Sequence, residues 1–323
     1  MQAIVQEEFG APADVLELGE VTRPVPGDNE VLVRIRAAGV HIGDWLVVNG
    51  LPYLIRAMGY GFRHPKERVP GTELAGTVEA VGTGVTRFQP GDEVFGWGTG
   101  GFAEYATIAE DALASKPANV SFEQAAAVPI SGFTALQGLR DKGEVQPTDK
   151  VLIIGASGGV GSLAVQIAKS YGADVTGVGS TRNLELIRAL GADHVIDYTR
   201  EKIAAGGRKY DLILDTAGNR SLSELRRALT PTGRLIIVGG SGGRWLMGSG
   251  RSARAAMVSP FVGQRLTAFI SAPNQDDLAV LQGLLETGDV IPAIDQTFAL
   301  SETAQALDHV GGRHTRGKTV ITM

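Results

Sequence analysis

The chain begins with short extended runs that turns separate, and this pattern continues to about residue 120. Val31–Ala37 has the sequence VLVRIRA, in which apolar and polar positions alternate as in a strand with one buried face. Ala75–Val81 and Glu93–Phe95 also have strand-like composition, and Pro90–Asp92 forms a turn signal between them. We expect an all-β unit here, folded as a partly open barrel.

From about Ser121 the pattern favours helices that alternate with buried strands. Ser121 with Glu123 and Gln124 is typical of a helix start, and SLAVQIAKSYG, NLELIRALG and SLSELRRALT have apolar residues at helical spacing. The sequence predicts an α/β fold whose second part is a doubly wound, six-stranded parallel sheet. Its strands, apolar enough for burial on both faces, are Val151–Ile154, Val175–Val178, His194–Ile196, Leu212–Leu214, Leu235–Val238 and Leu266–Ile270.

The end of the chain returns to the β pattern. An amphipathic helix, DDLAVLQGLLETG, follows Pro273, and the chain closes with the strand-like KTVIT. A completed six-stranded sheet has no place for this last strand, so we expect it to join the first unit. The predicted domains are residues 1–122 with 288–323, forming a catalytic domain, and residues 123–287, forming a nucleotide-binding domain inserted into it.

Composition narrows the classes of function. The net charge of −5 gives no general attraction to nucleic acid or anionic lipid, and no apolar stretch is long enough to span a membrane. The acidic opening MQAIVQEEFG lacks the features of a secretion signal, so we expect a cytoplasmic protein. Cysteine is absent and the histidines form no close pair, which leaves little for a metal site.

A glycine-rich turn follows the first strand of the predicted parallel sheet. Gly155 permits the tight turn, Gly158 lets the backbone approach a pyrophosphate, and Gly161 allows helix and strand to pack closely. Backbone N–H groups at the positive end of the next helix bind phosphate oxygens. We predict a Rossmann-type dinucleotide site whose loop is Gly155, Ala156, Ser157, Gly158, Gly159, Val160 and Gly161.

The tip of the second strand indicates which dinucleotide binds. An NAD site presents a carboxylate here to a ribose hydroxyl, whereas this tip carries Ser180, Thr181, Arg182 and Asn183. Their hydroxyl and amide groups can hydrogen-bond a 2′-phosphate, and Arg182 can add positive charge. The same residue types commonly cap helices, which is the simpler alternative. We predict NADPH as the cofactor.

The order of several motifs resembles that of a known family. A β-rich first domain is followed by PGTELAGTVEAVG, FQPGDEVFG, GASGGVG, LGADHVIDY and a closing GKTVI. Over essentially its whole length the chain resembles the medium-chain dehydrogenase/reductase superfamily, and within it the zinc-less quinone oxidoreductase branch that includes zeta-crystallin. The resemblance implies a GroES-like catalytic domain, a Rossmann domain and a cleft between them.

The positions of the zinc ligands in zinc-dependent relatives are changed in this sequence. By the resemblance, the first ligand position is His41, the second is Thr72, and the four-cysteine lobe has no counterpart. Zinc needs three protein ligands in a catalytic site, so we expect no metal. The zinc-less branch has asparagine at position 41, and the histidine found here leaves the role of this loop open.

The resemblance implies further contacts with the cofactor. Thr134 matches a residue that contacts the cofactor in the family, and Tyr198 matches a tyrosine near the adenosine phosphate of NADPH-dependent members. Val238, Gly239 and Gly240 end the fifth strand, where the backbone of the family faces the nicotinamide amide.

The expected reaction moves a hydride from NADPH to a quinone or to the β-carbon of an enone or 2-alkenal. The negative charge that develops on the carbonyl oxygen needs hydrogen-bond donors and a proton. Tyr53 is the first candidate donor because the family has a tyrosine at the matching place. His41 is the second, as a donor to the carbonyl or to the nicotinamide ribose. Aromatic packing is the alternative role for Tyr53, and we expect Asp44 to fix the loop.

Two long segments, 51–69 and 243–264, are expected to flank the cleft, where they can serve as lids. A slot for a flat substrate would consist of Trp45, Tyr53, Trp245, Met247 and Phe269, although scattered aromatic residues often only pack. Two other functions stay open: a dehydrogenase that oxidises alcohols, and a cofactor-binding protein without activity. We also predict a homodimer, because Leu266–Ile270 can be an edge strand that pairs with its symmetry mate.

Overall fold

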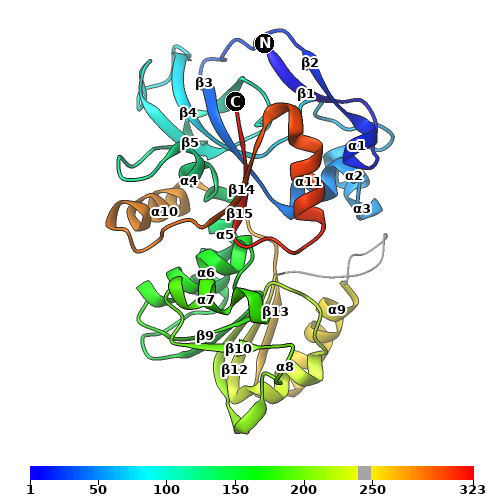
Figure 1. Cartoon of the computed structure of the whole chain (residues 1–323), viewed down its shortest axis with the longest axis vertical. Helices are drawn as coiled ribbons and strands as arrows, with labels where there is room; N and C mark the ends of the chain where they lie inside the picture. Colours follow the sequence, from blue (N-terminus) through cyan, green and yellow to red (C-terminus); the bar gives the residue numbers. More distant parts are fainter. Residues whose placement is uncertain (239–248) are drawn as a thin grey trace. The chain divides into compact units, whose positions relative to one another are not determined.

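The computed structural model describes residues 1–238 and 249–323, apart from the side chains at positions 57, 58 and 249. Contacts divide the chain into two compact units: Met1–Ser131 with Pro273–Met323 (unit 1), and Gly132–Ala272 (unit 2). Figure 1 shows the course of the chain, coloured along the sequence. None of the described helices combines the length and the apolar character that crossing a membrane requires.

Unit 2 is built around the predicted parallel sheet. The strand order is β10-β9-β8-β11-β12-β13, and every neighbouring pair is parallel. The strands are β8 (Lys150–Ile154), β9 (Asp174–Gly179), β10 (His194–Asp197), β11 (Tyr210–Asp215), β12 (Leu229–Ile237) and β13 (Arg265–Ala268). The order of the strands reverses between β8 and β11: the chain first adds strands on one side of β8 and then on the other. In such sheets, ligands bind beyond the carboxyl ends of the strands at this point.

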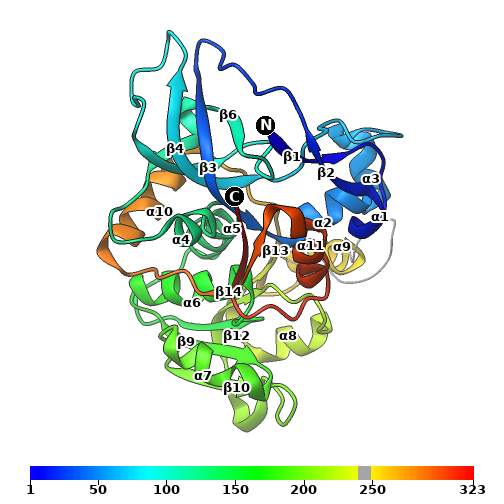
Figure 2. The ribbon, with the colours of Figure 1, turned by 45° about the horizontal axis from the view of Figure 1, so that its top comes forward.

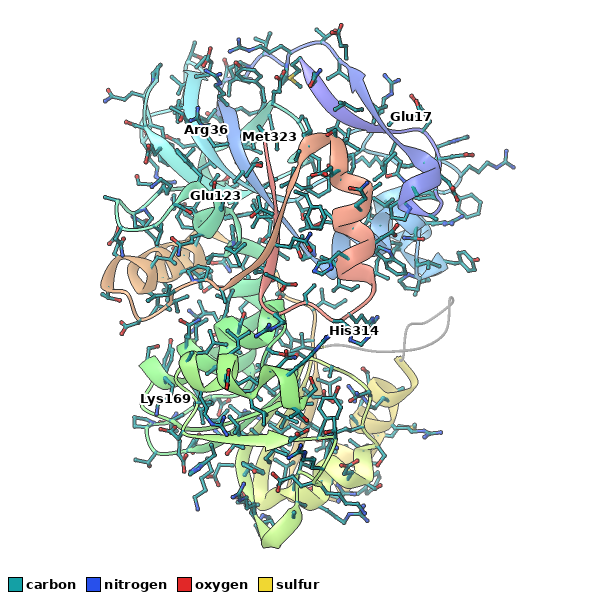
Figure 3. All side chains as sticks on the ribbon, viewed as in Figure 1. Glu17, Arg36, Glu123, Lys169, His314 and Met323 are labelled. Atoms are coloured by element: carbon teal, nitrogen blue, oxygen red, sulfur yellow. The ribbon has the colours of Figure 1, made fainter. Side chains whose placement is uncertain are left out.

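Helices pack on this sheet through apolar faces. α6 (Gly159–Ser170) contacts β8 and β9, α7 (Leu184–Ala189) contacts β9 and β10, α8 (Leu222–Ala228) contacts β12, and α9 (Ser249–Val258) contacts β13. In α6, Leu163, Val165 and Ile167 are fully buried. Lys169, labelled in Figure 3, lies near the end of α6 and pairs with Asp193 at 2.8 Å.

Unit 1 contains a seven-stranded sheet and a two-stranded sheet. In the larger one the order is β14-β15-β3-β4-β5-β7, and β6 also pairs with β3. The strands are β3 (Glu30–Val40), β4 (Glu73–Val81), β5 (Glu93–Trp97), β6 (Tyr105–Ala109), β7 (Leu113–Ser115), β14 (Ile294–Ala299) and β15 (Lys318–Thr322), while β1 (Gln2–Gln6) pairs with β2 (Leu16–Glu20). Over the described residues the sheet does not close into a ring, in agreement with the predicted partly open barrel.

The strands of the larger sheet enclose an apolar core. Val31, Val33 and Ile35 alternate along β3 and pack with Leu74 and Val94 of the neighbouring strands. Figure 2 shows β3 and β4 side by side. The tail strand β15 pairs antiparallel with β3, so the strand-like KTVIT joins the first unit as expected.

Helices complete unit 1, and two of them, α4 and α10, place its borders at other residues than predicted. They are α1 (Pro12–Val15), α2 (Ile42–Asn49), α3 (Tyr53–Ile55), α4 (Phe122–Ala126), α10 (Gln275–Thr287) and α11 (Thr303–Gly311), while α5 (Pro129–Gln137) spans the border. We predicted α10 and most of α4 in the nucleotide-binding part. Instead α4 packs on β3 and β4, and α10 packs on β7, where the amide of Asn119 donates to the carbonyl oxygen of Leu285 at 2.8 Å.

Candidate functional site

The glycine loop between β8 and α6 has the conformation that its sequence predicts. Gly155 has φ +82°, and a Cβ there would lie 2.6 Å from Thr216 Oγ1. A Cβ at Gly161 would lie 2.0 Å from the carbonyl oxygen of Gly155, so this position brings helix and loop into direct contact. At Gly158 a Cβ would meet only the same carbonyl oxygen, at 3.4 Å. Gly158 therefore leaves a space that a methyl group would fill.

The N terminus of α6 at this loop has no side-chain cap. Gly158 is the N-cap residue, with φ −84° and ψ 178°, and its carbonyl oxygen accepts from the N–H of Ser162 at 2.8 Å. The N–H groups of Gly159, Val160 and Gly161 precede this bond, and such first-turn groups have no partner within a helix. Together with the helix dipole they make this end of α6 suited to an anion such as a pyrophosphate.

The polar tip after β9 is not used for helix capping. Ser180 and Asn183 stand at the N-cap positions of the short 3₁₀ turn Thr181–Asn183 and of α7, and neither side chain makes a capping hydrogen bond. The capping alternative thus does not account for these residues. Arg182 is exposed at the tip.

A carboxylate that the sequence analysis missed lies beside this tip. Asp197, the last residue of β10, stands opposite Gly179 and accepts from the hydroxyl of Thr181 at 2.5 Å. Its other oxygen accepts from the N–H and the hydroxyl of Thr199 at 2.9 and 2.6 Å. These hydroxyl bonds, that of Thr181 first, hold the pKa of Asp197 below its ordinary value. The only signal in the sequence was the acid in HVIDY at the end of the neighbouring strand.

Asn183 links the tip to the glycine loop. Its Nδ2 donates to Ser157 Oγ at 2.9 Å, and both residues are buried. Its Oδ1 is buried with no hydrogen-bond partner in the described part of the chain. A buried acceptor without a partner costs free energy, and it marks a place where a ligand can donate. Tyr198, in contrast, is half exposed at the end of β10.

The turn after β11 lies against the first glycine of the loop. The hydroxyl of Thr216 donates to the carbonyl oxygen of Ile154 at 2.8 Å. Asp215 is fully buried and holds this turn by accepting the N–H groups of Ala217 and Gly218, at 3.2 and 3.0 Å. Arg251 of α9 donates to its other oxygen at 2.6 Å.

The remaining predicted residues of unit 2 lie at three other places. The hydroxyl groups of Thr134 and Ser271 form a hydrogen bond, with 2.8 Å between their oxygens. Phe269 is half-buried beside Gly138, where an added Cβ would touch its ring at 3.4 Å. The N–H of Val238 donates to the carbonyl oxygen of Asp215 at 3.0 Å. Four further predicted contacts, Gly239, Gly240, Trp245 and Met247, lie outside the described residues.

In unit 1, the structure brings His41, Asp44 and Thr72 together at the start of α2. His41 Nε2 lies 2.7 Å from Thr72 Oγ1, and the Thr72 hydroxyl donates to Asp44 Oδ1 at 2.8 Å. His41 Nδ1 accepts from the N–H of Gly43 at 2.9 Å, and the N–H of His41 donates to Asp44 Oδ2 at 3.0 Å. His41 is thus the N-cap of α2, and Asp44 fixes the loop, as expected.

Two buried acids, Asp44 of α2 and Glu73 of β4, lie in this region. Burial raises the pKa of Asp44, and the nearby Glu73 acts in the same direction, while His41 and the Thr72 hydroxyl bond oppose the rise. Glu73 itself is paired with Lys318 of β15, also fully buried, and Lys318 donates to Ser131 Oγ at 3.1 Å. Glu73 therefore has a buried counter-charge within unit 1.

The predicted aromatic residues of unit 1 are packed. Trp45 lies against α11, since a Cβ at Gly311 would be 2.4 Å from its indole nitrogen. The guanidinium of Arg56 lies over the ring of Tyr53, 5.0 Å from its centroid. This cation–π contact holds the Tyr53 ring at the start of α3.

Comparison with known proteins gives family matches for two parts of the chain. Residues 27–118 match the model described as alcohol dehydrogenase GroES-like domain, and residues 190–321 match the one described as zinc-binding dehydrogenase. A chloroplast envelope quinone oxidoreductase homolog from Arabidopsis thaliana is 32% identical, covering 99% of this chain and 98% of its own length. A quinone oxidoreductase from Sus scrofa is 34% identical, covering 99% and 96%.

Solved structures also match the whole chain. CurK enoyl reductase has a TM-score of 0.87 at 26% identity, and an NAD-dependent alcohol dehydrogenase has 0.86 at 30%. A quinone oxidoreductase from Escherichia coli, complexed with NADPH, has 0.83 at 26%. The coverage is 100% of this chain in each case, and 99%, 100% and 100% of the three structures.

One matched family description includes zinc, but the residues of unit 1 do not fit that metal. Both ring nitrogens of His41 are engaged in hydrogen bonds, and Thr72 offers only a hydroxyl group. The chain has no cysteine. In the described part of the chain, no three side chains of histidine, aspartate or glutamate are placed to hold a metal ion. Three protein ligands are the minimum for a catalytic zinc site.

Proposed function

The chain belongs to the medium-chain dehydrogenase/reductase superfamily, in its quinone oxidoreductase branch, and from this premise we propose that it uses NADPH to reduce a quinone or an α,β-unsaturated carbonyl compound. Relatives named quinone oxidoreductase, a similar structure with NADPH and a similar enoyl reductase support the proposal. When bound, NADPH supplies a hydride to the electrophilic carbon of the substrate.

The observation that carries this proposal is the uncapped end of α6 beside Gly158. First-turn N–H groups and the positive end of the dipole are available to phosphate oxygens there. The absence of a Cβ at Gly158 leaves the space for them. The unpartnered Oδ1 of Asn183 is an acceptor for a hydroxyl group of the same ligand. The residues present thus fit a dinucleotide.

The preference for NADPH rests on the tip after β9. Ser180 and Arg182 are not engaged as helix caps, and an arginine can form bidentate bonds with a phosphate. Thr181 contributes less than predicted, because its single hydroxyl proton is donated to Asp197. Ser180 and Arg182 therefore carry the proposed selection of the 2′-phosphate.

We propose Tyr53 as the proton donor, because a phenol can donate to an oxyanion and Arg56 holds its ring. Trp45, Trp245 and Phe269 stay predictions as substrate contacts.

The substitution Gly158→Ala tests the dinucleotide site. The added methyl group meets only the Gly155 carbonyl oxygen at 3.4 Å, so we expect folding to be kept. The methyl group fills the phosphate space, and the Kd for NADPH, measured by calorimetry, should rise about tenfold or more. Gly283→Ala in α10 is the matched control, because a Cβ there meets nothing within 4 Å. Unchanged NADPH affinity in Gly158→Ala would contradict the site.

Oxidation of an alcohol is the second candidate function, since a similar structure is an NAD-dependent alcohol dehydrogenase. Alkoxide intermediates in that reaction usually need a Lewis acid, which the ligand set of unit 1 does not fit. Steady-state assays with NADPH and a panel of quinones and enals, beside assays with NADP⁺ or NAD⁺ and alcohols, separate the two. Tight NADPH binding with no turnover of any substrate would instead indicate a cofactor-binding protein.

A further inference from the structure

The cluster of His41, Thr72 and Asp44 has one consistent arrangement of protons. Gly43 N–H donates to Nδ1 of His41, so Nδ1 carries a lone pair and the neutral ring has its proton on Nε2. Nε2–H then donates to Thr72 Oγ1 at 2.7 Å. The only hydroxyl proton of Thr72 goes to Asp44 Oδ1 at 2.8 Å. The chain of donors ends on the carboxylate.

The opposite direction of donation conflicts with the backbone. If a protonated Asp44 donated through Thr72 to Nε2, the ring proton would sit on Nδ1. It would then face the N–H of Gly43, and two donors would meet at 2.9 Å. Turning the ring over would place carbon atoms at 2.7 and 2.9 Å from the same two partners, where no hydrogen bond forms.

The backbone at Gly43 is part of the same arrangement. A Cβ at this residue would lie 2.5 Å from His41 Cε1 and 2.7 Å from Nδ1. The ring can lie against the first turn of α2 only because residue 43 is glycine. Asp44 completes the cap by accepting the N–H of His41 with its second oxygen.

We propose that Thr72 and Asp44 are positioning residues that hold His41 as its Nε2-protonated tautomer, and that His41 is therefore not the proton donor of the reaction. Both ring nitrogens are engaged within unit 1, so His41 has no N–H to offer a substrate oxygen while the cluster is intact. The statement about catalysis rests on the proposed function and deepens it. Of the two predicted donors it leaves Tyr53.

Nuclear magnetic resonance of the full-length chain tests the tautomer directly. Histidine is labelled with ¹⁵N, and the signals of His41 are identified by their loss in His41→Asn. We expect a single Nε2-protonated form near neutral pH, whether or not any substrate is turned over. Thr72→Val removes the partner of Nε2 that keeps the ring against the Gly43 N–H, so the ring should turn away from Gly43 and give averaged tautomer signals. Thr107→Val, at a half-buried position on β6, should leave the signals unchanged.

Kinetics test the second half of the proposal. His41→Asn keeps a side-chain oxygen that can accept the Gly43 N–H, because asparagine is a favourable N-cap residue. We expect it to lower kcat by less than about tenfold and to keep the shape of the pH profile, whereas loss of a proton donor costs about 10²–10⁴ in rate. His41→Leu, which has no acceptor, should lose more, and thermal unfolding of each variant shows whether it still folds.

Two results would overturn the proposal. One is an Nδ1-protonated His41 in the wild-type chain. The other is a loss of kcat by about a hundredfold or more in a folded His41→Asn variant, with one limb of the pH profile missing. A chain that reduces neither quinones nor enones would refute the proposed function, and the resonance spectra would still decide the tautomer of His41.

Discussion

Hydrogen-bonding capacity limits which residues at the tip after β9 can donate to a phosphate group of a ligand. A threonine hydroxyl has one proton to donate, and that of Thr181 goes to Asp197. Asn183 is buried and donates to Ser157. Ser180 and Arg182 are the tip residues that remain at or near the surface with no capping role. At the scale of single residues, we therefore propose that cofactor choice depends on Ser180 and Arg182.

We predict that Ser180→Ala combined with Arg182→Asp changes the cofactor preference. The 2′-phosphate loses a hydroxyl partner and meets a carboxylate in place of a guanidinium, so the Kd for NADPH should rise by about a hundredfold. NADH has no such phosphate, and its Kd should change by only a few-fold. Calorimetry with both dinucleotides measures this.

The control for this change is Arg188→Asp, an exposed arginine on α7 with the same change of charge. It should affect the two cofactors alike and only weakly. An equal loss of affinity for NADPH and NADH in the double variant would remove the assignment of the tip to the 2′-phosphate.

At the scale of elements, a buried ion pair attaches α9 to the carboxyl end of β11. Asp215 is fully buried, and Arg251 is the charged partner that the structure provides at 2.6 Å. Asp215 also holds the turn that lies against Gly155. Leaving one member of such a pair alone is costly, because a charge then stays buried without compensation.

We predict that Arg251→Met lowers the free energy of unfolding by about 3–5 kcal/mol. Chemical denaturation followed by fluorescence measures the change. The double variant Asp215→Asn with Arg251→Met should recover most of the loss, because asparagine keeps an acceptor for the turn and carries no charge. Arg254→Met, an exposed position on the same helix, should change stability by less than about 0.5 kcal/mol. A loss no larger than that of Arg254→Met would show that the ion pair is unimportant.

At the scale of the molecule, the β13 edge of the six-stranded sheet has the features of an interface. β13 ends the strand order of the six-stranded sheet, so its outer N–H and C=O groups have no neighbouring strand among the described residues. Ile270, two residues after β13, is 91% exposed, and Phe261 is 87% exposed. An open edge beside exposed apolar side chains is typical of an interface.

The predicted homodimer pairs β13 with its symmetry mate. Light scattering at micromolar concentration should give about twice the mass of the chain, and Ile270→Lys should shift it toward the monomer by placing like charges together at a twofold axis. Val25→Lys, at an 85% exposed position of unit 1, is the control and should leave the mass unchanged. A wild-type chain that runs as a monomer would contradict the prediction.

The sequence by itself determined the elements, because local patterns carry them. Alternation along Val31–Ala37, the six apolar segments and the spacing of Gly155, Gly158 and Gly161 all depend on residues near each other in the chain, and the structure confirms the sheets and the loop. The order of the motifs was also sufficient to identify the family of the chain. Strands, helices and turns can be predicted in this way because they depend on hydrophobic periodicity and on glycine and other turn residues close together in the sequence.

Only the tertiary structure decided which partners the polar groups and apolar faces find. The apolar face of α10 could cover either sheet, and packing on β7 placed it in unit 1. Asp197 reached Thr181, and His41 reached Thr72, across 16 and 31 positions of the sequence. A hydrogen bond depends on distances of about 3 Å in space, and residue spacing does not specify these when the partners lie on different elements.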